Sequence, residues 1–329
     1  MNWHGKKILV TGAGGFIGSH LCDALLDQGA EVTAFIRYTS RSDWGNLEFL
    51  SPEKKASLRV ESGNVEDSDF VGRHIRGKEL VFHLAALIGI PYSYHAPRSY
   101  VRSNIEGTVN VLESCRAAGV ERIVHTSTSE TYGTAQYTPI NEGHPLQGQS
   151  PYSATKIAAD KIAESYYLSF DLPVATIRPF NTYGPRQSAR AVIPTIISQA
   201  LTSQAIFLGA LEPVRDFTYV KDMAQAFLRV AESYTAIGQV INIGSGKGIS
   251  VRDLADMILR LMNVEKPLLQ QEARMRPPQS EVYNLICDSS RAKELTGWTP
   301  AYTLEAGLLE TIDFVSKNIP FYKPANYTV

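Results

Sequence analysis

Apolar residues in the first half of the chain form short β-branched runs that alternate with longer helical patterns. The run KKILVTG (6–12) ends in glycine, and the segment FIGSHLCDALLDQG behind it repeats apolar positions at helical spacing up to Gly29. Further strands are predicted at 31–38, 57–64, 78–86, 122–128 and 173–180, with the longest helices at 97–119 and 151–170. Alternation of strand and helix is typical of a parallel sheet covered on both faces, so the sequence predicts a doubly wound α/β fold.

The regular alternation ends after Asn181. Shorter apolar runs follow, such as AVIPTIISQAL, DFTYV and VINIG, and helices are predicted at 221–233, 250–262 and 303–316. Proline and glycine cluster between these elements. We therefore predict a first domain over residues 1–180 and a smaller C-terminal lobe over 181–329, with elements near 215–245 returning to the first domain.

Composition excludes several classes of partner. The 329 residues carry a formal net charge of −1 and are 44% hydrophobic, and the basic residues are scattered, so neither nucleic acid nor an anionic membrane is expected as a partner. The three cysteines lie far apart, which argues against a disulfide framework and a zinc site. The longest apolar stretch, LVFHLAALIGI, is too short to span a bilayer, and no signal-peptide pattern precedes the first strand. We expect a cytoplasmic protein without a metal.

A glycine-rich loop joins the first strand to the first helix. In TGAGGFIGSHL, Gly12, Gly15 and Gly18 follow a G-x-x-G-x-x-G pattern, with Ile17 where the standard dinucleotide fingerprint has its last glycine. Glycines allow a tight turn and let a pyrophosphate approach bare backbone at a helix N-terminus. At the head of an alternating α/β chain, the loop predicts a Rossmann-type dinucleotide-binding domain.

The end of the second predicted strand bears on the choice of cofactor. An acid usually follows the glycines by about 20 residues in NAD-binding sheets and holds the ribose 2′-hydroxyl. Here the strand ends in Arg37, Arg41 follows closely, and the next acid is Asp43. An arginine suits a 2′-phosphate, so NADP is favoured over NAD. Solvated arginines at a strand end are the alternative.

Two segments carry candidate catalytic groups. Tyr152 and Lys156 are four residues apart on a predicted helix and share one face. A lysine ammonium near a phenol favours the phenolate, and a positively charged nicotinamide adds to this effect. The segment TSTSETYG (126–133) ends the preceding strand, where Thr128 is expected to donate to the substrate oxygen that Tyr152 deprotonates. A chance surface pair is the alternative for Tyr152 and Lys156 taken alone.

These residues resemble the extended short-chain dehydrogenase/reductase family, in its nucleotide-sugar branch. The resemblance covers nearly the whole chain and is carried by TGAGGFIGSHL, HLAA (83–86), SNIEGTVNVLE (103–113), TSTSETYG, PYSATK, RPFNTYGPRQ (178–187), RDFTYVKD (215–222) and INIGSGKGISV (241–251). By resemblance, further cofactor contacts are Phe16, Ile17, Asn64, Val65, Leu84, Ala85 and Ala86. The family usually has an aspartate at the position of Asn64, whose amide oxygen can still accept a bond from adenine.

The triplet Thr128-Ser129-Glu130 resembles that of hexose 4,6-dehydratases. The resemblance implies that Tyr152 takes the sugar 4-hydroxyl proton during oxidation, that Glu130 removes the C5 proton, and that Ser129 bonds the departing C6 hydroxyl. The whole sequence is similar to bacterial 4,6-dehydratases of nucleotide-linked N-acetylglucosamine, UDP or GDP, in nonulosonic acid pathways. Return of hydride to C6 or to C4, which gives a 5,6-ene, remains open.

Other functions remain as alternatives. Nucleotide-uronate decarboxylases also carry Ser-Glu at this position, whereas a 4-epimerase has no task for Glu130. A non-catalytic dinucleotide-binding regulator would have no need of Thr128, Tyr152 and Lys156. Expected substrate contacts are Asn181, Arg186, Arg215 and Arg276, since arginine forks suit a diphosphate. The resemblance also implies a homodimer formed through the helices near 97–119 and 151–170.

Overall fold

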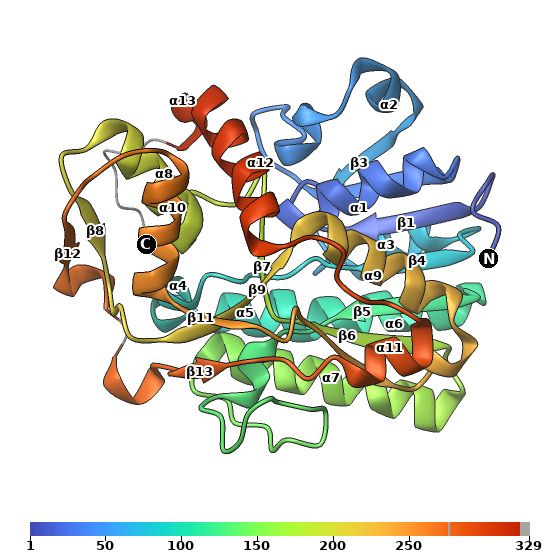
Figure 1. Ribbon diagram of the computed structural model, residues 1–329. Helices are drawn as coiled ribbons and strands as arrows, with labels where there is room; N and C mark the ends of the chain where they lie inside the picture. Colours follow the sequence, from blue (N-terminus) through green and yellow to red (C-terminus); the bar gives the residue numbers. More distant parts are fainter. Residues whose placement is uncertain (276, 323–329) are drawn as a thin grey trace.

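A parallel sheet of seven strands forms the centre of the first domain (Figure 1). The computed structural model describes residues 1–275 and 277–322. The strand order is β10-β6-β5-β4-β1-β2-β3, with order reversal beside β1. The strands are β1 (Lys7–Thr11), β2 (Glu31–Arg37), β3 (Arg59–Gly63), β4 (Leu80–His83), β5 (Arg122–Thr126), β6 (Val174–Pro179) and β10 (Val240–Ile243). The predicted Rossmann-type fold is confirmed.

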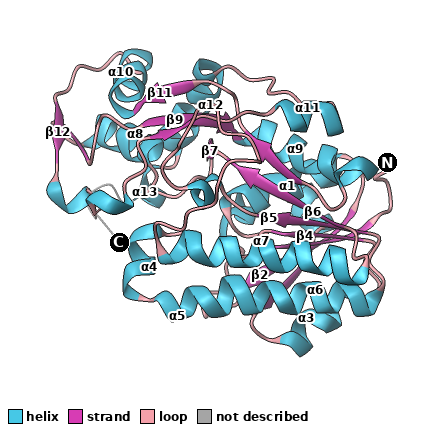
Figure 2. Ribbon diagram, turned by 90° about the horizontal axis from the view of Figure 1, so that it is seen from below, coloured by secondary structure: helices cyan, strands magenta, loops and turns pink. Residues whose placement is uncertain are grey.

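Helices cover both faces of this sheet (Figure 2). One face packs against α1 (Phe16–Asp27), α9 (Val220–Glu232) and α11 (Ser290–Thr296), and the other against α3 (Ser68–Ile75), α6 (Gly107–Ala118) and α7 (Pro151–Phe170). Successive residues of β1 therefore enter different cores: Ile8 and Val10 pack toward α1, and Leu9 packs toward α3 and α6. Burial on both faces is why these strands read as nearly continuous apolar runs.

The segment predicted as one helix over 97–119 is interrupted in its hydrogen-bond pattern. It consists of α5 (Pro97–Tyr100), a π-helical stretch at Val101–Glu106, and α6, which ends at Gly119 with φ +65°. Two shorter helices, α2 (Pro52–Ser57) and α4 (Ile90–His95), lie in the connections after β2 and β4. None of the helices in residues 1–275 and 277–322 is long and apolar enough to cross a membrane.

The smaller lobe has its own sheets and its own core. Its four-stranded sheet contains β7 (Asn181–Tyr183), β9 (Val214–Tyr219), β11 (Gly248–Ser250) and β13 (Asn284–Leu285), and β8 (Ile206–Leu208) pairs in parallel with β12 (Leu268–Gln270). Its helices are α8 (Val192–Thr202), α10 (Val251–Leu261), α12 (Leu304–Lys317) and α13 (Ile319–Tyr322). Side chains from α8, α10 and α12 share one buried apolar cluster with residues of β7 and β9.

The segment near 215–245, which is predicted to return to the first domain, is divided between the two lobes. β9 pairs with β7, β11 and β13, so residues 214–219 stay in the smaller lobe. The return to the first domain begins at Val220, where α9 packs against α1, and continues with β10, which pairs with β6. The later helix α11 also packs against α9 and β10, which the sequence analysis did not foresee. The sequence of a short strand does not show which sheet the strand joins, which explains why β9 was not assigned to the smaller lobe.

Phe227 provides a test of how α9 holds the first domain together. Its side chain is fully buried in the cluster that joins α9 to the sheet, with Phe82 at 6.3 Å between ring centroids. We expect Phe227→Ala to lower the free energy of unfolding by about 3–5 kcal/mol, because the cavity adds to the lost transfer energy. Urea denaturation measures the change. Leu309→Ala, at a side chain that is 50% exposed, is the control and should cost well under half as much.

Candidate active site

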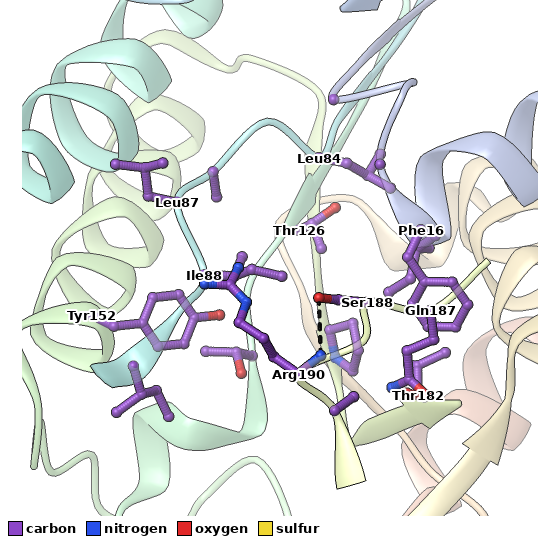
Figure 3. Close-up of a pocket in the computed structure, with 18 of the residues that line it drawn as sticks. Phe16, Leu84, Leu87, Ile88, Thr126, Tyr152, Thr182, Gln187, Ser188 and Arg190 are labelled. Carbon is purple, nitrogen blue, oxygen red and sulfur yellow. Dashed lines mark hydrogen bonds between the residues drawn. The ribbon is translucent and has the colours of Figure 1, made fainter. Parts of the chain in front are cut away.

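A large cavity of about 1090 Å³ lies at the carboxyl ends of the first-domain strands, and residues of the smaller lobe line its other side. It is lined by the loops after β1, β2, β4, β5 and β6 and by residues of β9, α8 and the loop after β8. Ligands of doubly wound sheets bind at this edge, where the strand order reverses. The cavity is therefore the candidate active site (Figure 3).

The glycine loop has the geometry of a phosphate cradle. Gly12 has φ +70°, and a Cβ there would lie 2.8 Å from the backbone nitrogen of Ala85. A Cβ at Gly18 would lie 2.3 Å from the Gly12 carbonyl oxygen, so α1 packs directly on the loop. Gly15 stands at the N-cap of α1, where no side chain caps the helix. The bare N–H groups of this helix end fit a pyrophosphate.

The structure brings most predicted cofactor contacts to one cavity. The lining residues among them are Gly12, Gly15, Phe16, Ile17, Gly18, Arg37, Asn64, Val65, Leu84, Ala85, Ala86, Tyr152 and Lys156. Arg41 is exposed and is absent from the lining, whereas Arg37 lines the cavity. The Asn64 side-chain oxygen accepts the backbone N–H of Glu66 at 3.2 Å, which fixes its orientation in the turn after β3.

A buried pair below the cavity holds the segment after β4 in place. Thr11 Oγ1 accepts bonds from the backbone N–H of Leu84 and of Ala85, at 3.1 and 3.2 Å, and contacts His83 Nδ1 at 2.8 Å. Burial lowers the pKa of His83 well below its ordinary value, so the ring is neutral. His83 is buried beside the backbone of Leu84 and Ala85 and is not among the residues that line the cavity.

Helix α7 presents Tyr152 and Lys156 to the cavity. A capping box formed by Ser150 and Ser153 starts the helix, and Pro151 occupies its first turn. This start places Tyr152 and Lys156 one turn apart on the buried face, with 7% and 3% exposure. Lys156 Nζ donates to the Thr126 carbonyl oxygen at 2.6 Å, and in Figure 3 the Tyr152 ring points into the cavity.

The turn after β5 brings the remaining catalytic candidates to the same place. A 3₁₀ turn spans Ser129–Tyr132, and Thr128 Oγ1 accepts the backbone N–H of Glu130 at 3.3 Å at its start. Thr128, Ser129 and Glu130 all line the cavity with Tyr152. The five residues expected to act in catalysis therefore line one cavity, with a carboxyl group on the turn and a phenol on α7.

Burial dominates the acid–base properties of the pair on α7. It raises the pKa of the Tyr152 phenol, and the hydrogen bond from Thr128 offsets only part of this effect. Burial also lowers the pKa of Lys156 to about 8, against the attraction of Asp160. The sequence predicts a phenolate favoured by lysine, but the protein's own residues leave the phenol neutral.

The predicted substrate contacts divide into two groups. Asn181 and Arg215 line the cavity, and Arg215 forms an ion pair with Glu281 at 3.1 Å. Arg186 does not line it, which corrects the expectation of a phosphate contact: its guanidinium bonds Asp23 on α1 at 3.0 Å, at 8% exposure. The opposite charge on α1 draws this side chain away from the cavity. Arg276 lies outside the described residues.

Sequence reasoning missed two groups of charged residues near the site. Arg190, in the loop before α8, points across the cavity toward Ile88 and Tyr152 (Figure 3). Asp160 and Arg178 form a buried ion pair below it. Asp160 stands one turn after Lys156, so its place on the same helix face was a readable signal. No local pattern marks Arg190.

Comparison with known proteins places the chain in a family. Residues 9–311 match the family described as GDP-mannose 4,6 dehydratase. The chain belongs to this family, which makes it an extended short-chain dehydrogenase/reductase of the nucleotide-sugar branch, as its motifs predict. Membership leaves open which reaction of the branch the chain catalyses, because dehydratases and epimerases are both among its relatives.

Three relatives illustrate this range. The UDP-glucose 4-epimerase of Mycolicibacterium smegmatis is 34% identical over 94% of this chain and 98% of its own length. The UDP-N-acetylglucosamine 4-epimerase of Methanobrevibacter ruminantium, solved with UDP-N-acetylmuramic acid, is 30% identical, with a TM-score of 0.86 over 96% of this chain and 99% of the other. A dTDP-glucose 4,6-dehydratase of Streptomyces venezuelae, solved with NAD, is 26% identical, with a TM-score of 0.86 over 97% and 99%.

Lys156→Met tests the burial of charge in the site. Because the pKa of Lys156 falls from 10.5 to about 8 on folding, its charge costs stability below pH 8. The cost, on the order of a few kcal/mol, disappears as the pH rises from 8 toward 10.5, where the folded protein has lost the proton and the unfolded chain still holds it.

We expect the variant to be more stable than the native protein at pH 7 and to lose most of this advantage by pH 10, in urea denaturation at each pH. Lys161→Met, at an exposed position of the same helix, is the control and should show no such pH dependence. If Lys156→Met stabilised the protein equally at pH 7 and at pH 10, the lowered pKa of Lys156 would be contradicted.

Proposed function

We propose that the protein is a nucleotide-sugar 4,6-dehydratase acting on UDP- or GDP-linked N-acetylglucosamine. The observation that carries the proposal is the position of Glu130, which lines the same cavity as Tyr152. An epimerase inverts C4 through oxidation and reduction alone and has no need of a base at C5. The amino sugar is supported by the resemblance of the whole sequence and by the 30% identical relative named for UDP-N-acetylglucosamine.

In the first step, Tyr152 removes the proton of the sugar 4-hydroxyl. Thr128 bonds the same oxygen and holds it at the phenol. A bound nicotinamide dinucleotide supplies the hydride acceptor for this oxidation, the hydride donor for the last step, and positive charge beside the phenol. The Lys156 ammonium lies below Tyr152 and, when protonated, adds to that charge.

In the second step, Glu130 removes the proton from C5. The ketone at C4 acidifies this hydrogen, and a carboxylate is basic enough to take it, whereas a serine is not. Ser129, which lines the cavity beside Glu130, bonds the C6 hydroxyl, which leaves as water with a proton delivered by Glu130, directly or through a relay. Hydride return to C6 and protonation of C5 complete a 4-keto-6-deoxy sugar, and return to C4 gives a 5,6-ene. No external reductant is consumed in either case.

A uronate decarboxylase is the second candidate, favoured by one observation. Arg190 is exposed in the cavity, and no ion pair to it is found among residues 1–275 and 277–322. A guanidinium in the cavity would suit a C6 carboxylate. Incubation with UDP-GlcNAc, GDP-GlcNAc and UDP-glucuronate, followed by NMR, separates the candidates. A 6-methyl signal identifies the 4,6-dehydratase, a vinylic pair the 5,6-ene, and loss of the C6 carboxyl the decarboxylase.

Glu130→Gln tests the proposed base. The amide keeps the size and hydrogen bonding of the side chain and loses its basicity, so reduction of the cofactor by the substrate should continue while water elimination falls by at least about 100-fold. Absorbance at 340 nm follows the first step, and NMR follows the product. Elimination at the native rate would exclude Glu130 as the base.

Arg37→Ala tests the preference for NADP. Since Arg37 lines the cavity at the end of β2, we expect its removal to weaken NADP binding by roughly 10–100-fold and to leave NAD binding nearly unchanged. Arg41→Ala, outside the lining, is the matched control and should affect neither dinucleotide. Equal affinity of the native protein for NAD and NADP would contradict the preference.

A further inference from the structure

A buried ion pair lies below the cavity and does not line it. Asp160 stands on α7 and Arg178 on β6, each with 3% exposure. Arg178 donates to Asp160 Oδ2 through both Nε and Nη2, at 3.1 and 2.9 Å. A buried pair of this kind is a weak source of stability, because desolvation of both charges offsets most of their attraction. Asp160 interacts with the surroundings of Lys156, and Arg178 interacts with the turn that carries Glu130.

The Asp160 end leads to Lys156. The two residues are one turn apart on the same face of α7, and Ser127 Oγ donates to Asp160 Oδ2 at 2.7 Å. Ser127 directly follows Thr126, whose carbonyl oxygen accepts the Lys156 ammonium at 2.6 Å. The Asp160 carboxylate thus attracts the Lys156 ammonium. It also holds Ser127, next to the Thr126 carbonyl to which the ammonium is bonded.

The Arg178 end leads to the turn that carries Glu130. Arg178 Nη1 donates to the Tyr132 hydroxyl oxygen at 2.9 Å, and its guanidinium lies over the Tyr132 ring at 4.9 Å. The Tyr132 hydroxyl in turn donates to Asn242 Oδ1 on β10 at 2.7 Å. Tyr132 is fully buried and ends the turn Ser129–Tyr132. Its ring therefore fixes this turn to the sheet.

We propose that Asp160 and Arg178 act as one positioning unit, which holds Lys156 as the ammonium below Tyr152 and holds the Glu130 turn against the sugar. The inference rests on the proposed dehydratase function. It assigns separate consequences to the two ends: loss of the Asp160 charge affects the oxidation at C4, and loss of the Tyr132 hydroxyl affects the elimination at C5–C6.

The charges around Lys156 support the first consequence. Lys156 interacts electrostatically with Asp160 on α7, His125 on β5 and His83 on β4. Tyr152 lies one turn before it on α7, and Arg178 on β6 bonds Asp160. Burial lowers the pKa of both histidines, so they are neutral, and Arg178 repels an ammonium. Within the described part of the chain, Asp160 is the carboxylate that attracts Lys156.

The first experiment is a pH profile of cofactor reduction by the nucleotide sugar. In Asp160→Asn, Lys156 should lose its proton more easily, and the basic limb should move to lower pH by about one unit. Ser127→Ala, a milder change, should move it in the same direction by less and guards against failure of the first variant to fold. Glu164→Gln, exposed on the same helix, is the control. A profile that is unchanged in folded variants overturns this half of the proposal.

The second experiment compares two steps in Tyr132→Phe, which keeps the ring and removes the hydroxyl. Water elimination should fall about tenfold, while cofactor reduction at 340 nm stays within about twofold of the native rate. A purely structural role would slow both steps equally, and that result overturns the inference.

The outcomes also separate this inference from the proposed function. A native protein that reduces its cofactor with none of the activated amino sugars refutes the dehydratase and with it the positioning unit. A native protein that forms the 6-deoxy product, combined with variants that behave like the native one, refutes the positioning unit alone.

Discussion

The rest of the site depends on one constraint: the Lys156 ammonium must keep its positive charge although it is almost fully buried. Lys156 is almost fully buried, and burial favours loss of its proton. Three elements counter this tendency: β5 offers the Thr126 carbonyl, α7 offers Asp160, and β6 holds Asp160 through Arg178. The position of α7 relative to β5 and β6 is therefore constrained, because a displaced α7 would move the Lys156 ammonium away from the Thr126 carbonyl oxygen.

The smaller lobe completes the cavity through contacts that hold its first loop on the first domain. His20 on α1 contacts the Pro185 carbonyl at 2.9 Å, Asp23 pairs with Arg186, and Asn46 donates to the Arg186 carbonyl at 2.9 Å. These contacts occupy Arg186 and fix the start of the loop that carries Arg190 into the cavity. Arg186, which belongs to a family motif, thus joins the two lobes, and Arg190, which lies outside the motif, lines the cavity.

The sequence predicts the first domain closely because its strands are buried on both faces and read as apolar runs. Each observed strand from β1 to β6 lies within the predicted range. Which short strands belong to which lobe is harder to predict. β9 is a short buried strand whose residues suit either sheet, and its partners β7, β11 and β13 are distant in sequence. Strand pairing is decided by the packing of the whole lobe, which no local window contains.

For the catalytic site, the sequence by itself determined the groups whose relation is local. The glycine loop, the triplet Thr128-Ser129-Glu130 and the Tyr152–Lys156 pair follow from helix and strand periodicity over a few residues. Only the tertiary structure decided which arginines face the cavity and which are bound elsewhere, as Arg215 and Arg186 show. The physical reason is that the partner of a long charged side chain is chosen in space, by carboxylates such as Asp23 that folding brings within reach.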